Sequence, residues 1–110
     1  KAAGIDEVLV FCVNDGQVMD AWAKDQGIAG SNIEFLADPC GEVAAELGMV
    51  LTHQGPVYKL GPNRSKRFTM FVDDGVIKVI ALSEGKDDPA GDDDPSNSCI
   101  DSVLAKISAL

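Results

Sequence analysis

The chain has 110 residues, and 45% of them are hydrophobic, which suits a small globular domain able to bury its own core. Its formal net charge of −9 argues against a nucleic-acid partner, because phosphates require a basic surface. No apolar run approaches the roughly 18 residues that a membrane-spanning helix needs. The three cysteines, Cys12, Cys40 and Cys99, lie far apart and the one histidine is His53. A closed zinc site is therefore not expected, and no cofactor is predicted.

The negative charge is concentrated in one segment, residues 83–97. Six acidic residues in this segment stand against Lys86 and account for −5 of the total charge. The Gly, Pro and Asp content predicts a solvated loop, and it does not match the pattern of a calcium-binding loop. The net charge of the chain therefore reflects the composition of one loop and does not indicate a particular kind of partner.

The chain begins with a strand and a helix. The apolar run of residues 8–13 predicts a strand buried on both faces of a parallel sheet. Asp15 follows it and can accept a backbone N–H at the start of a helix, whose apolar residues repeat at helical spacing through Lys24. Gly27 lies where a left-handed residue ends such a helix.

A second strand and helix are predicted next. Residues 32–37 form the shorter strand, and Asp38-Pro39 would open the helix, with Pro39 in the first turn where proline is best tolerated. The helix would stop at Gly48. Residues 49–65 are rich in Gly and Pro and predict a long connection without regular structure.

The C-terminal part gives the clearest local signal. Residues 67–73 and 76–82 are β-rich and flank Asp74-Gly75, a pair that supplies the positive φ angles of a two-residue hairpin turn. After the acidic segment, residues 99–110 predict an amphipathic helix. Its inward face would carry Ile100, Val103, Leu104 and Ile107.

This order of elements predicts one α/β domain over residues 1–110, with a mixed sheet and a C-terminal hairpin and helix. Strand–helix alternation that ends in this way is typical of the second part of a thioredoxin-like fold. The first core strand and the catalytic helix of that fold are not among the predicted elements. Without the strand, sheet edges would keep unpaired buried backbone groups at a cost of roughly 1–3 kcal/mol each. We therefore expect the domain to be incomplete.

Short motifs along nearly the whole chain occur in the order and spacing of a known family. They are Gly4-Ile5-Asp6-Glu7-Val8, Val13-Asn14-Asp15, Phe35-Leu36-Ala37-Asp38-Pro39, Ser65-Lys66-Arg67-Phe68-Thr69-Met70 and Asp74-Gly75-Val76. With these motifs the chain resembles the type II, or atypical two-cysteine, peroxiredoxins of the redoxin family. The resemblance implies that the chain is the C-terminal two-thirds of such a domain.

The resemblance implies an antioxidant thiol peroxidase. Members reduce hydrogen peroxide and organic hydroperoxides, take electrons from thioredoxin or glutaredoxin, and form homodimers or larger complexes. The expected location is intracellular, in the cytosol or in an organelle such as the chloroplast, mitochondrion or peroxisome. The alternative is a non-catalytic, peroxiredoxin-like subunit or scaffold of a larger assembly, which would keep the same fold.

The family's peroxidatic cysteine belongs to a Pro-x-x-x-Thr/Ser-x-x-Cys motif upstream of the segment that begins at Gly4. Only three residues precede Gly4 in this sequence, and the motif is absent from them. None of Cys12, Cys40 and Cys99 matches the peroxidatic position. We therefore expect the 110-residue chain on its own to be inactive.

Arg67 matches the family's arginine, which orients the thiolate and the peroxide oxygens. Its permanent cation would lower the pKa of a nearby thiol, and its planar group presents several hydrogen-bond donors to a developing oxyanion. Without the resemblance, an arginine at a strand start would be interpreted as a surface charge.

Each cysteine has its own interpretation. Cys99 lies where some family members place a resolving cysteine, just before the final helix, but an incidental cysteine at a helix start fits equally well. Cys12 is predicted to be a buried core thiol. Cys40, in the first turn after Asp38, is predicted to be a minor redox-sensitive site.

Overall fold

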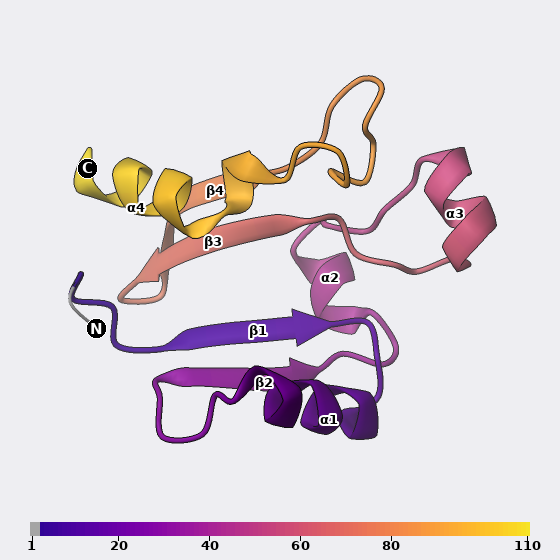
Figure 1. Ribbon diagram of the computed structural model, residues 1–110. Coiled ribbons are helices and arrows are strands. Elements are labelled where there is room, and N and C mark those ends of the chain that lie inside the picture. The colour runs from indigo at the N-terminus through magenta and orange to yellow at the C-terminus, as the bar shows by residue number, and fades with distance from the viewer. Residues whose placement is uncertain (1–2) are drawn as a thin grey trace. The chain divides into compact units, whose positions relative to one another are not determined.

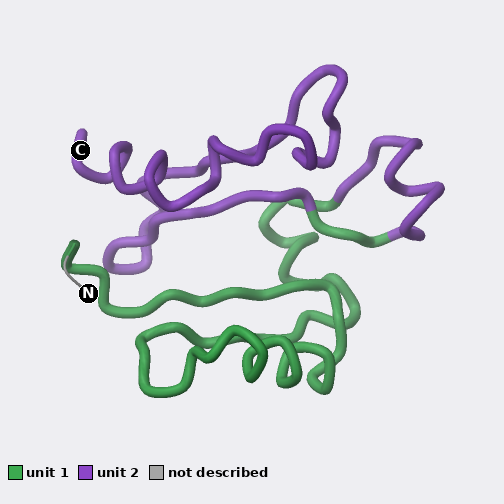
Figure 2. Tube along the Cα trace, in the orientation of Figure 1, with its two compact units in different colours: residues 1–50, 63–65 green, residues 51–62, 66–110 purple. Residues whose placement is uncertain are grey.

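The computed structural model describes residues 3–110 (Figure 1), which divide into two compact units. One unit contains the chain up to residue 50 together with residues 63–65, and the other contains residues 51–62 and 66–110 (Figure 2). The expectation of a single domain over residues 1–110 stays a prediction.

A parallel strand pair forms the centre of the first unit. Strand β1 (Val8–Cys12) pairs with β2 (Ile33–Ala37), and helix α1 (Gly16–Gln26) connects them (Figure 1). Trp22 of α1 meets Phe35 of β2 edge to face, with ring centroids 4.6 Å apart. This aromatic contact anchors the helix to the strand pair.

Both ends of α1 are those predicted. Asp15 has extended backbone and its carboxylate accepts the N–H of Val18 at 2.9 Å, so it is the N-cap. Gly27 ends the helix with a φ of 63°, in the left-handed region that glycine adopts without strain. These two residues set the length of the helix that joins the strands.

Strand β1 is more exposed than expected. Val8 and Leu9 are 40% and 53% exposed, whereas the sequence predicted burial on both faces. Burial on both faces requires elements packed on each face of the sheet, and this two-stranded sheet leaves both side chains exposed. The prediction of a strand is confirmed, and the prediction of its burial is wrong.

Helix α2 (Glu42–Glu46) begins later than the sequence indicated. Pro39 lies in a turn ahead of it, so the prediction of Pro39 in the first helical turn is wrong. Asp38 is buried and reaches across this turn, accepting the N–H groups of Val43 at 3.2 Å and Ala44 at 3.1 Å. Asp38 therefore caps the helix from several residues upstream.

The connection over residues 49–65 contains a helix that the sequence analysis missed, α3 (Gln54–Leu60). His53 is its N-cap, and Nδ1 accepts the N–H of Gly55 at 3.1 Å. Gly55 and Pro56 fall in the first turn, where neither residue breaks a helix. The Gly and Pro content of this segment therefore gave a wrong prediction of no regular structure.

The second unit is built on an antiparallel hairpin. Strands β3 (Phe68–Asp73) and β4 (Val76–Leu82) pair as predicted, with a register shift between Phe71 and Val72. Asp74 and Gly75 form the turn, with φ values of 51° and 76°. Parallel and antiparallel pairing are thus both present, in two separate two-stranded sheets.

The short helix η1 (Ser96–Ser98) precedes the C-terminal helix α4 (Ile100–Ser108). Val103 is buried as predicted, but Ile100 is 72% exposed, which contradicts its predicted inward position. Ile100 opens the first helical turn, and its side chain faces solvent there. Among residues 3–110, no helix is long and apolar enough to cross a membrane.

Candidate functional site around Arg67

Arg67 lies directly before β3, at the open end of the hairpin. Its carbonyl oxygen accepts the N–H of Ser83 at 3.0 Å, so the two residues face each other across the strand pair. The side chain is 49% exposed, and Nη2 lies 3.0 Å from Oδ1 of Asp92. The hairpin therefore fixes the backbone of Arg67, and a carboxylate contacts its guanidinium.

Lys66, the preceding residue, has an acidic partner from the same segment. Its Nζ lies 3.4 Å from Oε1 of Glu84. Glu84 and Asp92 both belong to residues 83–97, which we call the acidic loop. Two adjacent cations before β3 are thus each paired with the acidic loop.

The acidic loop is folded on itself by Asp88. The carboxylate of Asp88 accepts the N–H of Asp94 at 2.9 Å and that of Asp93 at 3.2 Å. These hydrogen bonds, that from Asp94 first, hold the pKa of Asp88 below its usual value. Their contribution to stability is present above the ordinary pKa of aspartate and is lost as the pH falls through the lowered value.

Ser83 closes the base of the acidic loop. It is buried, and its hydroxyl donates to the carbonyl of Pro95 at 2.9 Å while accepting the N–H of Ser98 at 3.2 Å. Gly91 lies against it, because a Cβ added to Gly91 would be 2.3 Å from the Ser83 carbonyl oxygen. The loop is therefore exposed to solvent and yet held at both ends, which places Asp92 beside Arg67.

Replacement of Gly91 tests this closure. We expect Gly91→Ala to lower the free energy of unfolding by roughly 1–3 kcal/mol, since φ is +71° and the new methyl group would clash with Ser83. The matched control is Gly48→Ala, because Gly48 has a φ of +69° and nothing within 4 Å of an added Cβ. Urea denaturation measures both, and equal losses would contradict the close packing of the loop.

Cys99 is the N-cap of α4 and belongs to the same unit as Arg67. It is exposed, and its thiol donates to the carbonyl of Pro95 at 3.3 Å. Thr69 of β3 donates to the carbonyl of Ser98 at 2.7 Å and fixes the backbone just before it. The thiol is thus accessible on an ordered backbone, and its resolving role stays a prediction.

The other two cysteines differ in exposure. Cys12 is half-buried at the end of β1, and burial raises the pKa of its thiol, which disfavours the nucleophilic thiolate. Cys40 is exposed in the turn before α2. Of these two thiols, Cys40 is the more accessible to oxidants in solvent.

Alkylation should distinguish the three thiols. At about pH 8, iodoacetamide should modify Cys40 and Cys99 at least about threefold faster than Cys12, because the thiolate reacts and Cys12 is both shielded and less ionised. Peptide mass spectrometry over a time course measures the three rates. A Cys12 that reacts first would show that its burial is not protective.

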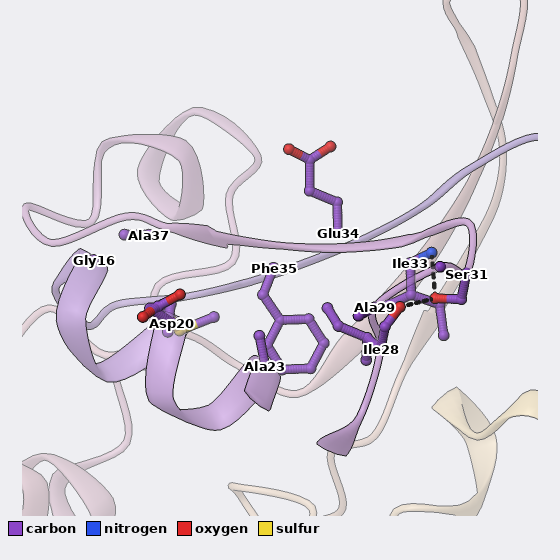
Figure 3. Close-up of a pocket in the computed structure, with 12 residues that line it drawn as sticks. Gly16, Asp20, Ala23, Ile28, Ala29, Ser31, Ile33, Glu34, Phe35 and Ala37 are labelled. Atoms are coloured by element: carbon purple, nitrogen blue, oxygen red, sulfur yellow. Dashed lines mark hydrogen bonds between the residues drawn. The ribbon is translucent and has the colours of Figure 1, made fainter. Parts of the chain in front are cut away.

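The first unit has a depression whose lining contains neither Arg67 nor any of the three cysteines. It is formed between α1 and β2, where Phe35 points toward Ala23 of the helix and Glu34 points to the other side (Figure 3). Asp20 at its rim forms an ion pair with Lys24 at 2.9 Å. The one hydroxyl in its lining, that of Ser31, donates to the carbonyl of Ile28 and not to a carboxylate, so we assign the depression no chemistry.

Comparison with known proteins identifies the class. The family model for Redoxin matches residues 1–97. The chain is 41% identical over 85 residues to Peroxiredoxin-2E, chloroplastic, of Arabidopsis thaliana, covering 77% of this chain and 36% of that protein. It is 32% identical over 102 residues to a peroxiredoxin of Rhizobium etli, covering 88% of this chain and 54% of that protein.

Solved structures agree with the sequence relatives. Reduced Prx3 from Vibrio vulnificus superimposes with a TM-score of 0.77 at 28% identity, over 97% of this chain and 61% of that one. The chain belongs to the redoxin family, and its fold is that of the thioredoxin-fold peroxiredoxins. Both predictions from the sequence are confirmed. The chain spans 36% and 54% of the lengths of the two curated relatives.

Proposed function

We propose that the natural protein is a thiol peroxidase that reduces hydrogen peroxide and organic hydroperoxides with thioredoxin or glutaredoxin as electron donor. The observation that carries this proposal is the match of the redoxin family to residues 1–97. Within this range, the resemblance implies that Arg67 is the family's arginine. In this proposal the nucleophile is a cysteine other than Cys12, Cys40 and Cys99. Because the chain spans part of its relatives, the proposal concerns the whole protein.

The reaction begins at the thiolate of that cysteine. It attacks one peroxide oxygen, the O–O bond breaks, and the leaving oxygen takes a proton to form water or an alcohol. The cysteine is oxidised to a sulfenic acid. The Cys99 thiol then attacks the sulfenic sulfur, forming a disulfide and releasing water. A donor dithiol reduces this disulfide and is itself oxidised.

Arg67 supplies the positive charge in this scheme. Asp92 contacts one end of the guanidinium, through Nη2, so the remaining N–H groups can face a thiolate and a peroxide. A permanent cation beside the sulfur favours the thiolate, and its donors stabilise the oxygen as the O–O bond breaks. The half-exposed side chain supports this role, because a peroxide can reach it from solvent.

Location and assembly are further parts of the proposal. Two relatives, at 41% and 36% identity, are chloroplastic peroxiredoxins from Arabidopsis thaliana and Oryza sativa. We place the natural protein inside the cell, in the cytosol or in an organelle such as the chloroplast. A homodimer or a larger complex is the expected assembly.

The resolving role of Cys99 can be tested in the natural protein. Cys99→Ser should leave the first oxidation by hydrogen peroxide unchanged and lower donor-coupled turnover by at least about tenfold, because the disulfide between the oxidised cysteine and Cys99 cannot form. Cys40→Ser is the matched control, since Cys40 is also exposed. Stopped-flow oxidation and steady-state turnover separate the two steps. Unchanged turnover in the Cys99 variant would remove this cysteine from the cycle.

A further inference from the structure

The cations before β3 carry little free positive charge. Lys66 is paired with Glu84, near the start of the acidic loop, and Arg67 with Asp92, in its second half. The loop holds six acidic residues and one lysine. An ion approaching Arg67 along this side therefore meets a net negative surface.

We propose that Asp92 is a specificity-determining residue, whose carboxylate disfavours hydroperoxides that themselves carry a negative charge. The inference rests on the proposed function, in which Arg67 faces the peroxide. Asp92 would then leave neutral substrates, such as hydrogen peroxide and alkyl hydroperoxides, as the preferred class.

The geometry makes Asp92 a fixed neighbour of Arg67 and not a passing one. Both side chains are exposed, at 49% for Arg67 and 73% for Asp92, so the ion pair by itself is weak. The backbone of Asp92 is nevertheless held in place, because Gly91 packs on Ser83 and Asp88 binds the next two N–H groups. The position of this backbone keeps the carboxylate near Arg67.

The two substrate classes need different things from Arg67. A neutral hydroperoxide needs only N–H donors, and the guanidinium keeps some free while one end contacts Asp92. An anionic hydroperoxide would gain from the cation, but Asp92 already offsets that charge at 3.0 Å and the rest of the loop repels the anion. The loop therefore selects against charge rather than against size.

The discrimination should depend on salt. At about 0.01 M ionic strength the Debye length is about 30 Å, so the whole loop acts on an approaching anion. At about 1 M it falls to about 3 Å, and exposed charges are screened. We expect discrimination of roughly three- to tenfold at low salt, which disappears at high salt.

The test compares cumene hydroperoxide with its para-carboxylate analogue as substrates of the natural protein. Asp92→Asn keeps an oxygen that can accept from Arg67 and removes the charge. At low ionic strength the substitution should raise kcat/KM for the anionic substrate by about three- to tenfold over the unaltered protein. It should leave kcat/KM for the neutral substrate within about twofold. The rise should vanish at about 1 M salt.

Asp73→Asn is the matched control. It removes the same charge from an exposed residue at the far end of β3, about 20 Å from Arg67 along the strand. If both substrates are turned over and the ratio of anionic to neutral kcat/KM is equal in the two variants, the role of Asp92 is overturned and the proposed function is not. Absence of turnover with either substrate in the unaltered protein would overturn the proposed function, and this inference with it.

Discussion

The 110-residue chain, produced on its own, is expected to reduce no hydrogen peroxide above background when coupled to thioredoxin or glutaredoxin. The proposed nucleophile is a cysteine other than Cys12, Cys40 and Cys99. Burial raises the pKa of the Cys12 thiol and so disfavours its thiolate. Cys40 and Cys99 are exposed, but no motif of the resemblance places either of them at the peroxidatic position. A coupled assay of donor oxidation measures the rate.

The natural protein is the reference for this experiment. Circular dichroism of the isolated chain should accompany the assay, to show whether a chain without activity is folded. A rate within about tenfold of the natural protein would show that one of the three cysteines is the nucleophile. Single serine substitutions at Cys12, Cys40 and Cys99 would then identify it.

The second large effect is expected at Arg67 in the natural protein. Arg67→Lys should lower kcat/KM for hydrogen peroxide by about tenfold or more, because lysine keeps the charge and loses the planar set of donors. One charged donor lost from the transition state is worth at least about 1.4 kcal/mol. The free energy of unfolding should change by less than about 1 kcal/mol, because the ion pair with Asp92 is exposed.

Lys66→Arg is the matched control for this substitution. It is the reverse exchange at the neighbouring position, where the cation is paired with Glu84. We expect its kcat/KM to stay within about twofold of the unaltered protein. Kinetics that remain unchanged in Arg67→Lys would remove the catalytic role proposed for Arg67.

Local signals in the sequence predicted much of the fold. Asp15 and Gly27 bound α1, and Asp74-Gly75 forms the hairpin turn, because each of these features depends on residues a few positions apart. The family motifs added the class of fold, which the comparisons confirm. Neither the local signals nor the family motifs required knowledge of how distant segments pack.

The misses arose where distant or unusual contacts decide the structure. Helix α3 begins at a histidine cap within a Gly- and Pro-rich segment, and α2 is capped by Asp38 from four residues upstream of its first residue. Arg67 was singled out by its motif. Its partner Asp92 is 25 residues away, and no spacing rule distinguishes it from the other acids of the loop. Only the closure of the loop shows which carboxylate reaches the arginine.

The most direct test of the proposed function is the consumption of hydrogen peroxide by the natural protein with reduced thioredoxin or glutaredoxin. The scheme predicts that one donor dithiol is oxidised for each peroxide consumed, and that Arg67→Lys slows this reaction. Failure of the natural protein to consume peroxide with either donor would contradict the scheme. That result would favour the alternative, in which this redoxin fold serves as a non-catalytic subunit.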